Sequence, residues 1–152
     1  MKYFKELSGD NLYTSWNTRV GAEWDHSLTA HIDILTFMHQ LCNLEKGTRI
    51  TWKTPGSIKH LCEGWLDNCK GSHPYVCRDL CTAFAIAMGV PVDLNAKNAK
   101  ENLIGLKMSS SNYNNLYYNV MNYGATDLEF AMMTRPDQYQ LKLHKQKYGY
   151  SL

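Results

Sequence analysis

The chain has 152 residues, of which 44% are hydrophobic and 20% are charged; this excludes a disordered or fibrous protein and allows a core of its own. Its 16 basic and 14 acidic residues mostly alternate and give a formal charge of +2, so no global electrostatic field marks it as a nucleic-acid or membrane binder. The odd number of cysteines, five, argues against a secreted disulfide framework, and no apolar run approaches the roughly 18 residues of a membrane span, so we expect a cytoplasmic protein.

Apolar periodicity predicts a helix in most segments of the first half. One helix runs through residues 12–24, where Leu, Trp and Val recur at steps of four, and a second covers residues 27–44 after a capping serine. The apolar face of the second helix is broad: Leu28, His31, Ile32, Leu35, Phe37, Met38, Leu41 and Cys42. We therefore expect this helix at the centre of the core.

The next helices are delimited by Pro and Gly. Residues 49–52 are strand-like but short, and Thr54 then caps a helix over residues 55–69. Pro74 opens a further helix over residues 74–88, which ends before a Gly and a Pro. With the helix at 27–44, these two helices form the predicted core.

The second half predicts a weaker helix and then three clearer ones. The weaker pattern starts at a cap near residues 93–95 and passes through Leu103 and Leu106. Three helices follow a serine-rich break, at residues 113–124, 126–133 and 136–149. The sequence therefore predicts one all-α, bundle-like domain over residues 1–152, with six to eight helices and at most a short strand near residues 49–52.

Four potential metal ligands recur at steps of four residues: Cys69, His73, Cys77 and Cys81. Thiolate and imidazole are ligands that zinc prefers. Zinc knuckles usually separate two ligands by two residues, whereas steps of four place Cys77 and Cys81 on one helical face, where small thiols are common in a core. The favoured interpretation is core cysteines and no cofactor, with structural zinc as the alternative.

Cys77 is also a candidate nucleophile. A motif of about sixteen residues resembles the helix that opens with the catalytic Cys in transglutaminase-like and papain-like folds: Val76-Cys77-Arg78-Asp79-Leu80, then Ala83-Phe84-Ala85, then Gly89-Val90-Pro91. The resemblance implies a thiol enzyme in which the helix N-terminus stabilises the thiolate of Cys77. Only His144 follows Cys77, on a predicted helix, so the sequence identifies no strand-borne histidine as its base.

The segment 109–124 is rich in Ser, Asn and Tyr, a composition typical of adaptable contact surfaces. Tyr113 and Tyr117 share a stripe with apolar residues and can belong to the core. The residues expected to remain outside are the candidate binding residues Asn115, Tyr118, Asn119, Asn122 and Tyr123. The alternative is an ordinary solvated surface.

The last predicted helix is basic. It carries Lys142, Lys145 and Lys147 and has no acid after Asp137. With the short helix and the Thr-Arg-Pro turn before it, this helix resembles the second helix of a helix-turn-helix, whose lysines would contact phosphates. Basic residues in a last turn also stabilise the helix dipole, which is the alternative interpretation.

The sequence favours a small binding or regulatory protein that docks a protein partner through its second half. Its compactness and Asn content fit a virus- or phage-encoded effector. The chain has no phosphate-binding loop, dinucleotide fingerprint or nucleophile elbow, which disfavours most nucleotide-driven enzymes. Two alternatives remain, a thiol enzyme that uses Cys77 and a nucleic-acid binder that uses the last helix, and the oligomeric state is left open.

Overall fold

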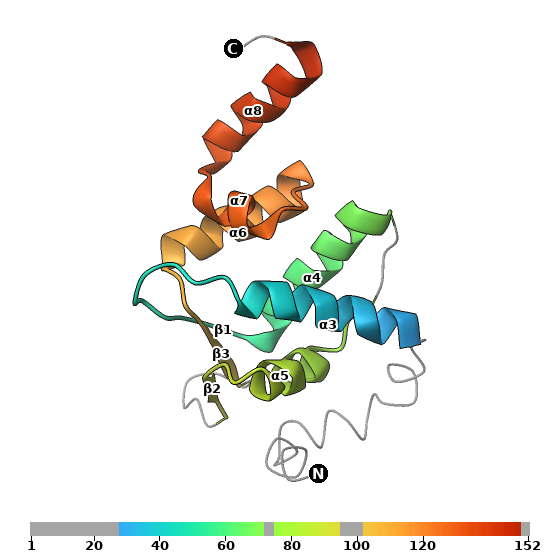
Figure 1. The fold of residues 1–152 in the computed structure, drawn as a ribbon, viewed down its shortest axis with the longest axis vertical. Helices are drawn as coiled ribbons and strands as arrows, with labels where there is room; N and C mark the ends of the chain where they lie inside the picture. Colours follow the sequence, from blue (N-terminus) through green and yellow to red (C-terminus); the bar gives the residue numbers. More distant parts are fainter. Residues whose placement is uncertain (1–27, 72–74, 95–101, 150–152) are drawn as a thin grey trace.

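Helices make up most of the part of the chain that the computed structural model describes, residues 28–71, 75–94 and 102–149 (Figure 1). The helices are α3 (Leu28–Cys42), α4 (Pro55–Lys70), α5 (Arg78–Ala87), α6 (Ser110–Tyr123), α7 (Leu128–Met133) and α8 (Pro136–Tyr148). The strands are β1 (Thr51–Lys53), β2 (Val92–Asp93) and β3 (Leu103–Leu106). The predicted helical fold with a short strand near residues 49–52 is confirmed, while the helix predicted at residues 12–24 lies outside the described residues.

The ends of α4 are set by the residues that the sequence indicated. Thr54 accepts a hydrogen bond from the backbone N–H of Ser57 at 3.2 Å, and Pro55 occupies the first turn. Gly71 ends the helix with a φ of 65°, a conformation that Gly adopts without steric cost. Local capping therefore fixes where α4 begins and ends, and so fixes the side chains of its first turn.

The predicted start of the next helix at Pro74 is wrong. Residues 75–77 are not helical, and α5 begins at Arg78 with Cys77 as its N-cap. The reason is tertiary: the backbone N–H of Val76 donates to the carboxylate of Glu63 on α4 at 3.2 Å, which anchors this segment outside the helix. Pro74 itself lies outside the described residues.

The weak helix predicted through Leu103 and Leu106 is also wrong. These residues form β3, the central strand of a three-stranded antiparallel sheet with the order β1-β3-β2. Ile104 and Leu106 are buried, and a short apolar run in a central strand lacks the polar alternation that would identify it as a strand. Gly105 leaves room for Trp52 to lie across it, since a Cβ there would be 3.1 Å from that ring.

The core is built where α3, α4, α5, α6 and α7 meet. Phe37 of α3 and Trp65 of α4 are both buried, with ring centroids 5.6 Å apart. The buried stripe of α3 follows Ile34, Phe37, Met38 and Leu41 at helical spacing. Two residues expected on that face, Ile32 and Leu35, lie beside the stripe and are 52% and 42% exposed.

The last helix, α8, differs from the others because none of its residues is buried. Figure 1 shows that it extends away from the rest of the described structure, with its first turns near α6 and α7. A helix without a buried face gains little from tertiary packing, so its surface is available over most of its length.

Candidate functional site

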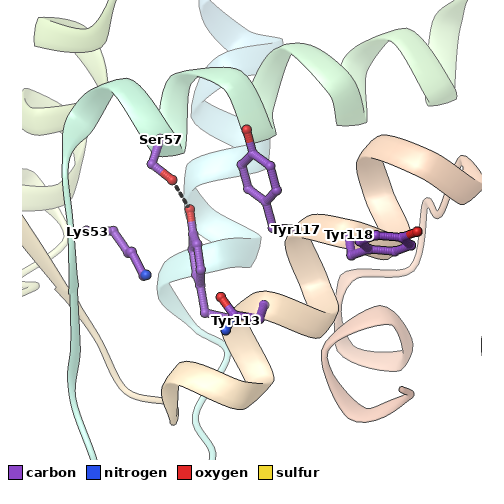
Figure 2. Close-up of a pocket in the computed structure, with 6 residues that line it drawn as sticks. Lys53, Ser57, Tyr113, Tyr117 and Tyr118 are labelled. Atoms are coloured by element: carbon purple, nitrogen blue, oxygen red, sulfur yellow. Dashed lines mark hydrogen bonds between the residues drawn. The ribbon is translucent and has the colours of Figure 1, made fainter. Parts of the chain in front are cut away.

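A pocket of about 410 Å³ lies where β1, α4 and α6 meet (Figure 2). It is lined by Lys53, Ser57, Tyr113, Asn114, Tyr117 and Tyr118. Three of these six residues are tyrosines, and a single one is charged. The volume and the mixture of aromatic surface with polar groups are typical of ligand-binding pockets.

The junction of β1 with α4 positions one side of the pocket. Lys53 is the last residue of β1 and pairs with Ile104 in the central strand. Thr54 follows at once as the N-cap of α4, so Ser57 lies in the first turn of that helix. The sheet and the cap together hold Lys53 and Ser57 at fixed places on the same side of the pocket.

The inner wall of the pocket is a hydrogen-bonded pair. The hydroxyls of Ser57 and Tyr113 are 2.6 Å apart, and either can be the donor (Figure 2). Burial raises the pKa of Tyr113 to about 12, although the hydrogen bond to Ser57 lowers it in part. The phenol therefore stays neutral at physiological pH. Only one of the two hydroxyl protons is used in the hydrogen bond between Ser57 and Tyr113, so the other can be donated to a ligand.

Lys53 lies against the ring of Tyr113, with its Nζ 4.7 Å from the ring centroid. Such a contact is a cation–π interaction, which orients an ammonium without neutralising its charge. Tyr117 continues the aromatic wall, with its ring 6.1 Å from that of Tyr113. Among the described residues Lys53 has no carboxylate partner, so it gives the pocket a positive end.

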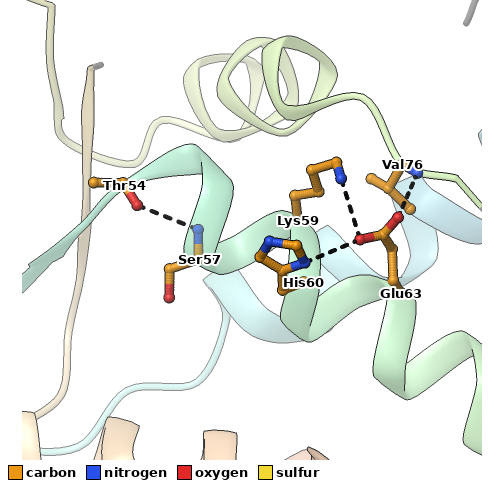
Figure 3. A network of polar contacts seen from close by, with 6 residues as sticks. All are labelled: Thr54, Ser57, Lys59, His60, Glu63 and Val76. Carbon is orange, nitrogen blue, oxygen red and sulfur yellow. Dashed lines mark hydrogen bonds and ion pairs between the residues drawn. The ribbon is translucent and has the colours of Figure 1, made fainter. Parts of the chain in front are cut away.

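Another lysine, Lys59 of α4, makes a similar contact with a tyrosine ring, but it is also paired with a carboxylate. The Nζ of Lys59 lies 4.5 Å from the ring centroid of Tyr75. It also lies 3.3 Å from Oε1 of Glu63 (Figure 3). Nδ1 of His60 approaches the same oxygen at 3.4 Å, and the N–H of Val76 donates to the other. This network ties residues 75–76 to α4 and thereby fixes the segment that leads into α5.

Beyond the pocket, aromatic rings continue across α6, α7 and α8. Tyr118 contacts Tyr123 edge to face at 5.6 Å, and Tyr123 stacks on Tyr139 of α8 at 6.0 Å with an angle of 5° between the rings. Phe130 of α7 contacts Tyr139 at 5.6 Å, and Lys142 lies 3.9 Å above the ring of Phe130. We call the pocket and these four aromatic residues the tyrosine surface.

Four of the five predicted binding residues on α6 are at least partly accessible. Tyr118 is 46% exposed, Asn122 is exposed, and Asn115 and Tyr123 are partly buried. Tyr118 lines the pocket, and Tyr123 continues the row of rings toward α8.

The placement of Asn119 on the outer surface is wrong. Asn119 is completely buried, and its amide donates to the backbone carbonyls of Ala131 at 2.9 Å and Thr134 at 2.7 Å. Both carbonyls lie at the C-terminal end of α7, where a helix leaves acceptors without partners of its own. Asn119 therefore joins α7 to α6 and is not a contact residue.

The predicted basic residues of α8 are exposed. Lys142, Lys145 and Lys147 all lie on α8, and Lys147 also contacts the ring of Tyr148 at 5.2 Å. The nucleic-acid interpretation of these lysines stays a prediction.

The predicted zinc ligands do not form a metal site in the part of the chain that is described. Cys77 and Cys81 are buried, Cys69 is exposed near the end of α4, and His73 lies outside the described residues. No three His, Cys, Asp or Glu side chains among the described residues converge to hold a metal ion. Burial raises the pKa of Cys81 far above the usual range, so its thiol is neutral at physiological pH.

Cys77 is the N-cap of α5, which agrees with the helix-terminal position that a thiol nucleophile requires. Its side chain is only 3% exposed, so a substrate would have to displace neighbouring residues to reach the sulfur. The catalytic role of Cys77 stays a prediction.

Sequence reasoning did not identify most of the pocket: Lys53, Ser57, Tyr113, Asn114 and Tyr117. Lys53 and Ser57 meet Tyr113 only because α4 packs on α6, a contact between segments 56 residues apart. The one local signal was the spacing of Tyr113 and Tyr117, which put both rings on one face of a helix.

Comparison of the chain with protein-family models, with curated proteins and with solved structures finds no match. In the described segments, no helix combines the length and the apolar character needed to cross a bilayer.

Proposed function

We propose that the chain is a small binding protein that docks a protein partner through the tyrosine surface. The observation that supports this proposal is the connected row from Tyr118 through Tyr123 to Tyr139, in which each ring is held by the next while facing solvent in part. Tyrosine offers large contact area at low entropic cost and is enriched at the centres of protein interfaces.

The arrangement of the row also favours binding on energetic grounds. Ordering a flexible side chain at an interface costs free energy, and rings that are already held lose less freedom when a partner arrives. Met121 on α6 and Met133 on α7 are also exposed and add adaptable apolar contact area on these helices. The tyrosine surface is thus prepared for a partner before it binds.

Site-specific cross-linking tests the proposal. A photoreactive phenylalanine analogue replaces Tyr118 in one variant and Leu35 of α3 in another, because these two side chains have similar exposures of 46% and 42%. In extracts of the cells that encode the protein, we expect a discrete protein adduct from position 118 and none from position 35. Equal labelling from both positions, or none from position 118, contradicts the proposal.

A second candidate function is nucleic-acid binding through α8. Its support is a helix without buried residues that carries Lys142, Lys145 and Lys147. Binding through these lysines predicts an affinity that falls steeply with salt and falls again when all three are replaced by Gln. Salt-independent binding, or unchanged binding by the triple variant, contradicts it.

The proposed site of action is the cytoplasm. All five cysteines are free thiols in this structure, a state that a reducing compartment maintains. A regulatory protein that meets its partner there needs no disulfide to keep its fold.

A further inference from the structure

Lys53, at the end of β1, and Lys59, on α4, both rest on tyrosine rings, and only Lys59 also has a carboxylate beside it. Lys59 contacts the ring of Tyr75 at 4.5 Å and the carboxylate of Glu63 at 3.3 Å. Lys53 contacts the ring of Tyr113 at 4.7 Å and has no carboxylate partner among the described residues. The pocket thus contains a lysine and a tyrosine ring (Figure 2) but no counterpart of Glu63, the carboxylate that pairs with Lys59 (Figure 3).

Two further lysines, Lys70 and Lys107, also have carboxylate partners. Lys70 pairs with Asp33 at 2.7 Å, and Lys107 pairs with Glu45 at 3.5 Å. Lys53 differs from them because it is partly buried in a pocket and because its charge is directed along an aromatic wall. An ammonium that has lost part of its hydration gains more from an incoming anion than a fully solvated one does.

The rest of the pocket suits an anion as well. None of the described residues that line it is a carboxylate, and its polar groups besides Lys53 are the hydroxyls of Ser57, Tyr113, Tyr117 and Tyr118 and the amide of Asn114. Hydroxyl and amide groups can donate to a carboxylate, and charge-assisted hydrogen bonds are stronger than those between neutral groups. An anion in this pocket would therefore find donors and no like charge.

We infer that the pocket accepts the carboxylate of a Glu or Asp side chain from an acidic peptide segment of the partner, with Lys53 as its counter-ion. The inference rests on the proposed docking function and specifies the partner's side chain that would bind in the pocket. The tyrosine rings beside Lys53 supply apolar surface for the aliphatic part of that side chain and for a neighbouring residue. A volume of about 410 Å³ has room for both.

The charge of the pocket favours a peptide over a nucleic acid here. Nucleic acids bind through several phosphate contacts, whereas this pocket offers one cation.

A peptide titration of the full chain followed by NMR tests the inference. The probe is the acetylated and amidated tetrapeptide Ala-Glu-Leu-Ala, and the matched control is the same peptide with Gln in place of Glu. We expect saturable shifts of the Lys53 and pocket tyrosine signals with the Glu peptide and an affinity at least about tenfold lower with the Gln peptide.

Variants of the chain supply the second comparison. Lys53→Met should lower affinity for the Glu peptide about tenfold or more, Lys53→Arg should retain most of it, and Lys145→Met on α8 should leave it unchanged. Thermal unfolding followed by circular dichroism checks that each variant is folded. If Lys53→Met does not fold, the comparison of the Glu and Gln peptides alone decides the question.

Several outcomes overturn the inference. These are the absence of saturable shifts, equal affinities for the two peptides, unchanged binding by a folded Lys53→Met, or tighter binding of inorganic phosphate or of octathymidylate at the same signals. If cross-linking from position 118 persists while the Glu peptide does not bind, the docking function is retained and only the inference of an acidic anchor is rejected. If the Glu peptide binds but no partner is cross-linked from position 118, the carboxylate-binding pocket is retained and the docking function is rejected.

Discussion

Lys59 on α4 and Lys53 at the end of β1 lie against tyrosine rings at 4.5 and 4.7 Å, but the two contacts have different roles. At Lys59 the anion is Glu63, so the chain completes the arrangement itself and uses it to hold residues 75–76 in place. At Lys53 no described carboxylate completes it. A lysine therefore stabilises the fold where the chain neutralises its charge, and it is available for binding where the chain does not.

The asparagines of α6 repeat this contrast. Asn119 faces inward and donates to two carbonyls of the α7 end, whereas Asn122 faces solvent and donates only to Tyr118 of its own helix at 3.3 Å. The same helix therefore carries a structural amide and an accessible amide three positions apart. Mutations can separate the two roles.

The largest expected effect on folding is at Asn119. Asn119→Ala removes the donor from the carbonyls of Ala131 and Thr134, the first of these bonds being buried, and we expect it to lower the free energy of unfolding by about 2 to 3 kcal/mol. Urea denaturation measures the loss. The matched variant Asn122→Ala should change stability by less than about 0.5 kcal/mol, and a similar loss in both variants would remove the distinction between the two faces.

The next effect concerns the buried wall of the pocket at alkaline pH. Because the pKa of Tyr113 is about 12 in the folded chain and about 10 when unfolded, the folded state keeps a proton that the unfolded state loses between these values. Its contribution to stability is complete below pH 10 and is lost as pH rises toward 12. We expect Tyr113 to account for about 1 kcal/mol of the stability lost between pH 9 and pH 11.

Tyr113→Phe provides the control for that titration. The variant lacks the phenol proton, so denaturation at pH 9 and pH 11 should show a smaller difference than in the parent chain. An identical difference would show that Tyr113 titrates as an exposed tyrosine does and that the inner wall of the pocket is open to solvent.

A smaller effect is expected at Glu63. Glu63→Gln retains an acceptor for the N–H of Val76 but removes the charge opposite Lys59, and this partly exposed pair should contribute about 1 kcal/mol. Lys53→Met, the counterpart at the pocket, should change stability by less than about 0.5 kcal/mol. Guanidinium denaturation of both variants measures the contrast, and equal losses would contradict it.

The smallest effect on folding belongs to Tyr118, where Tyr118→Ser should stay within about 0.5 kcal/mol of the parent chain because the side chain is half exposed. The same variant should lose most of the binding to the cross-linked partner. Leu35→Ser, with similar exposure, should retain partner binding in a pull-down with purified components. Unfolding of Tyr118→Ser would show that this residue is structural.

The helix boundaries that depend on local chemistry could be predicted from the sequence. Thr54 and Pro55 fix the start of α4, and Gly124 ends α6 in the left-handed conformation with a φ of 67°. Pro136 likewise opens α8. These residues act through their own backbone or the next turn, so a single sequence is enough to identify them.

Features that depend on contacts between distant segments could not be predicted. The strand at Leu103–Leu106 exists because β1 and β2 pair with it on both sides. Asn119 is buried because the end of α7 needs donors, and Lys53 becomes a pocket residue because α4 and α6 meet at the Ser57–Tyr113 hydrogen bond. Each of these facts involves a partner that a local pattern does not contain.

The attachment of α8 has a mechanical consequence. The helix has 13 residues, none of them buried, and it is held to the body through the rings that contact Tyr139 near its start. Since such a helix is about 20 Å long, a tilt of about 10° at its base would move its far end by roughly 3 Å. A partner that shifts Tyr139 would thus tilt α8, and a small displacement at the tyrosine surface would become a larger one at Lys145 and Lys147.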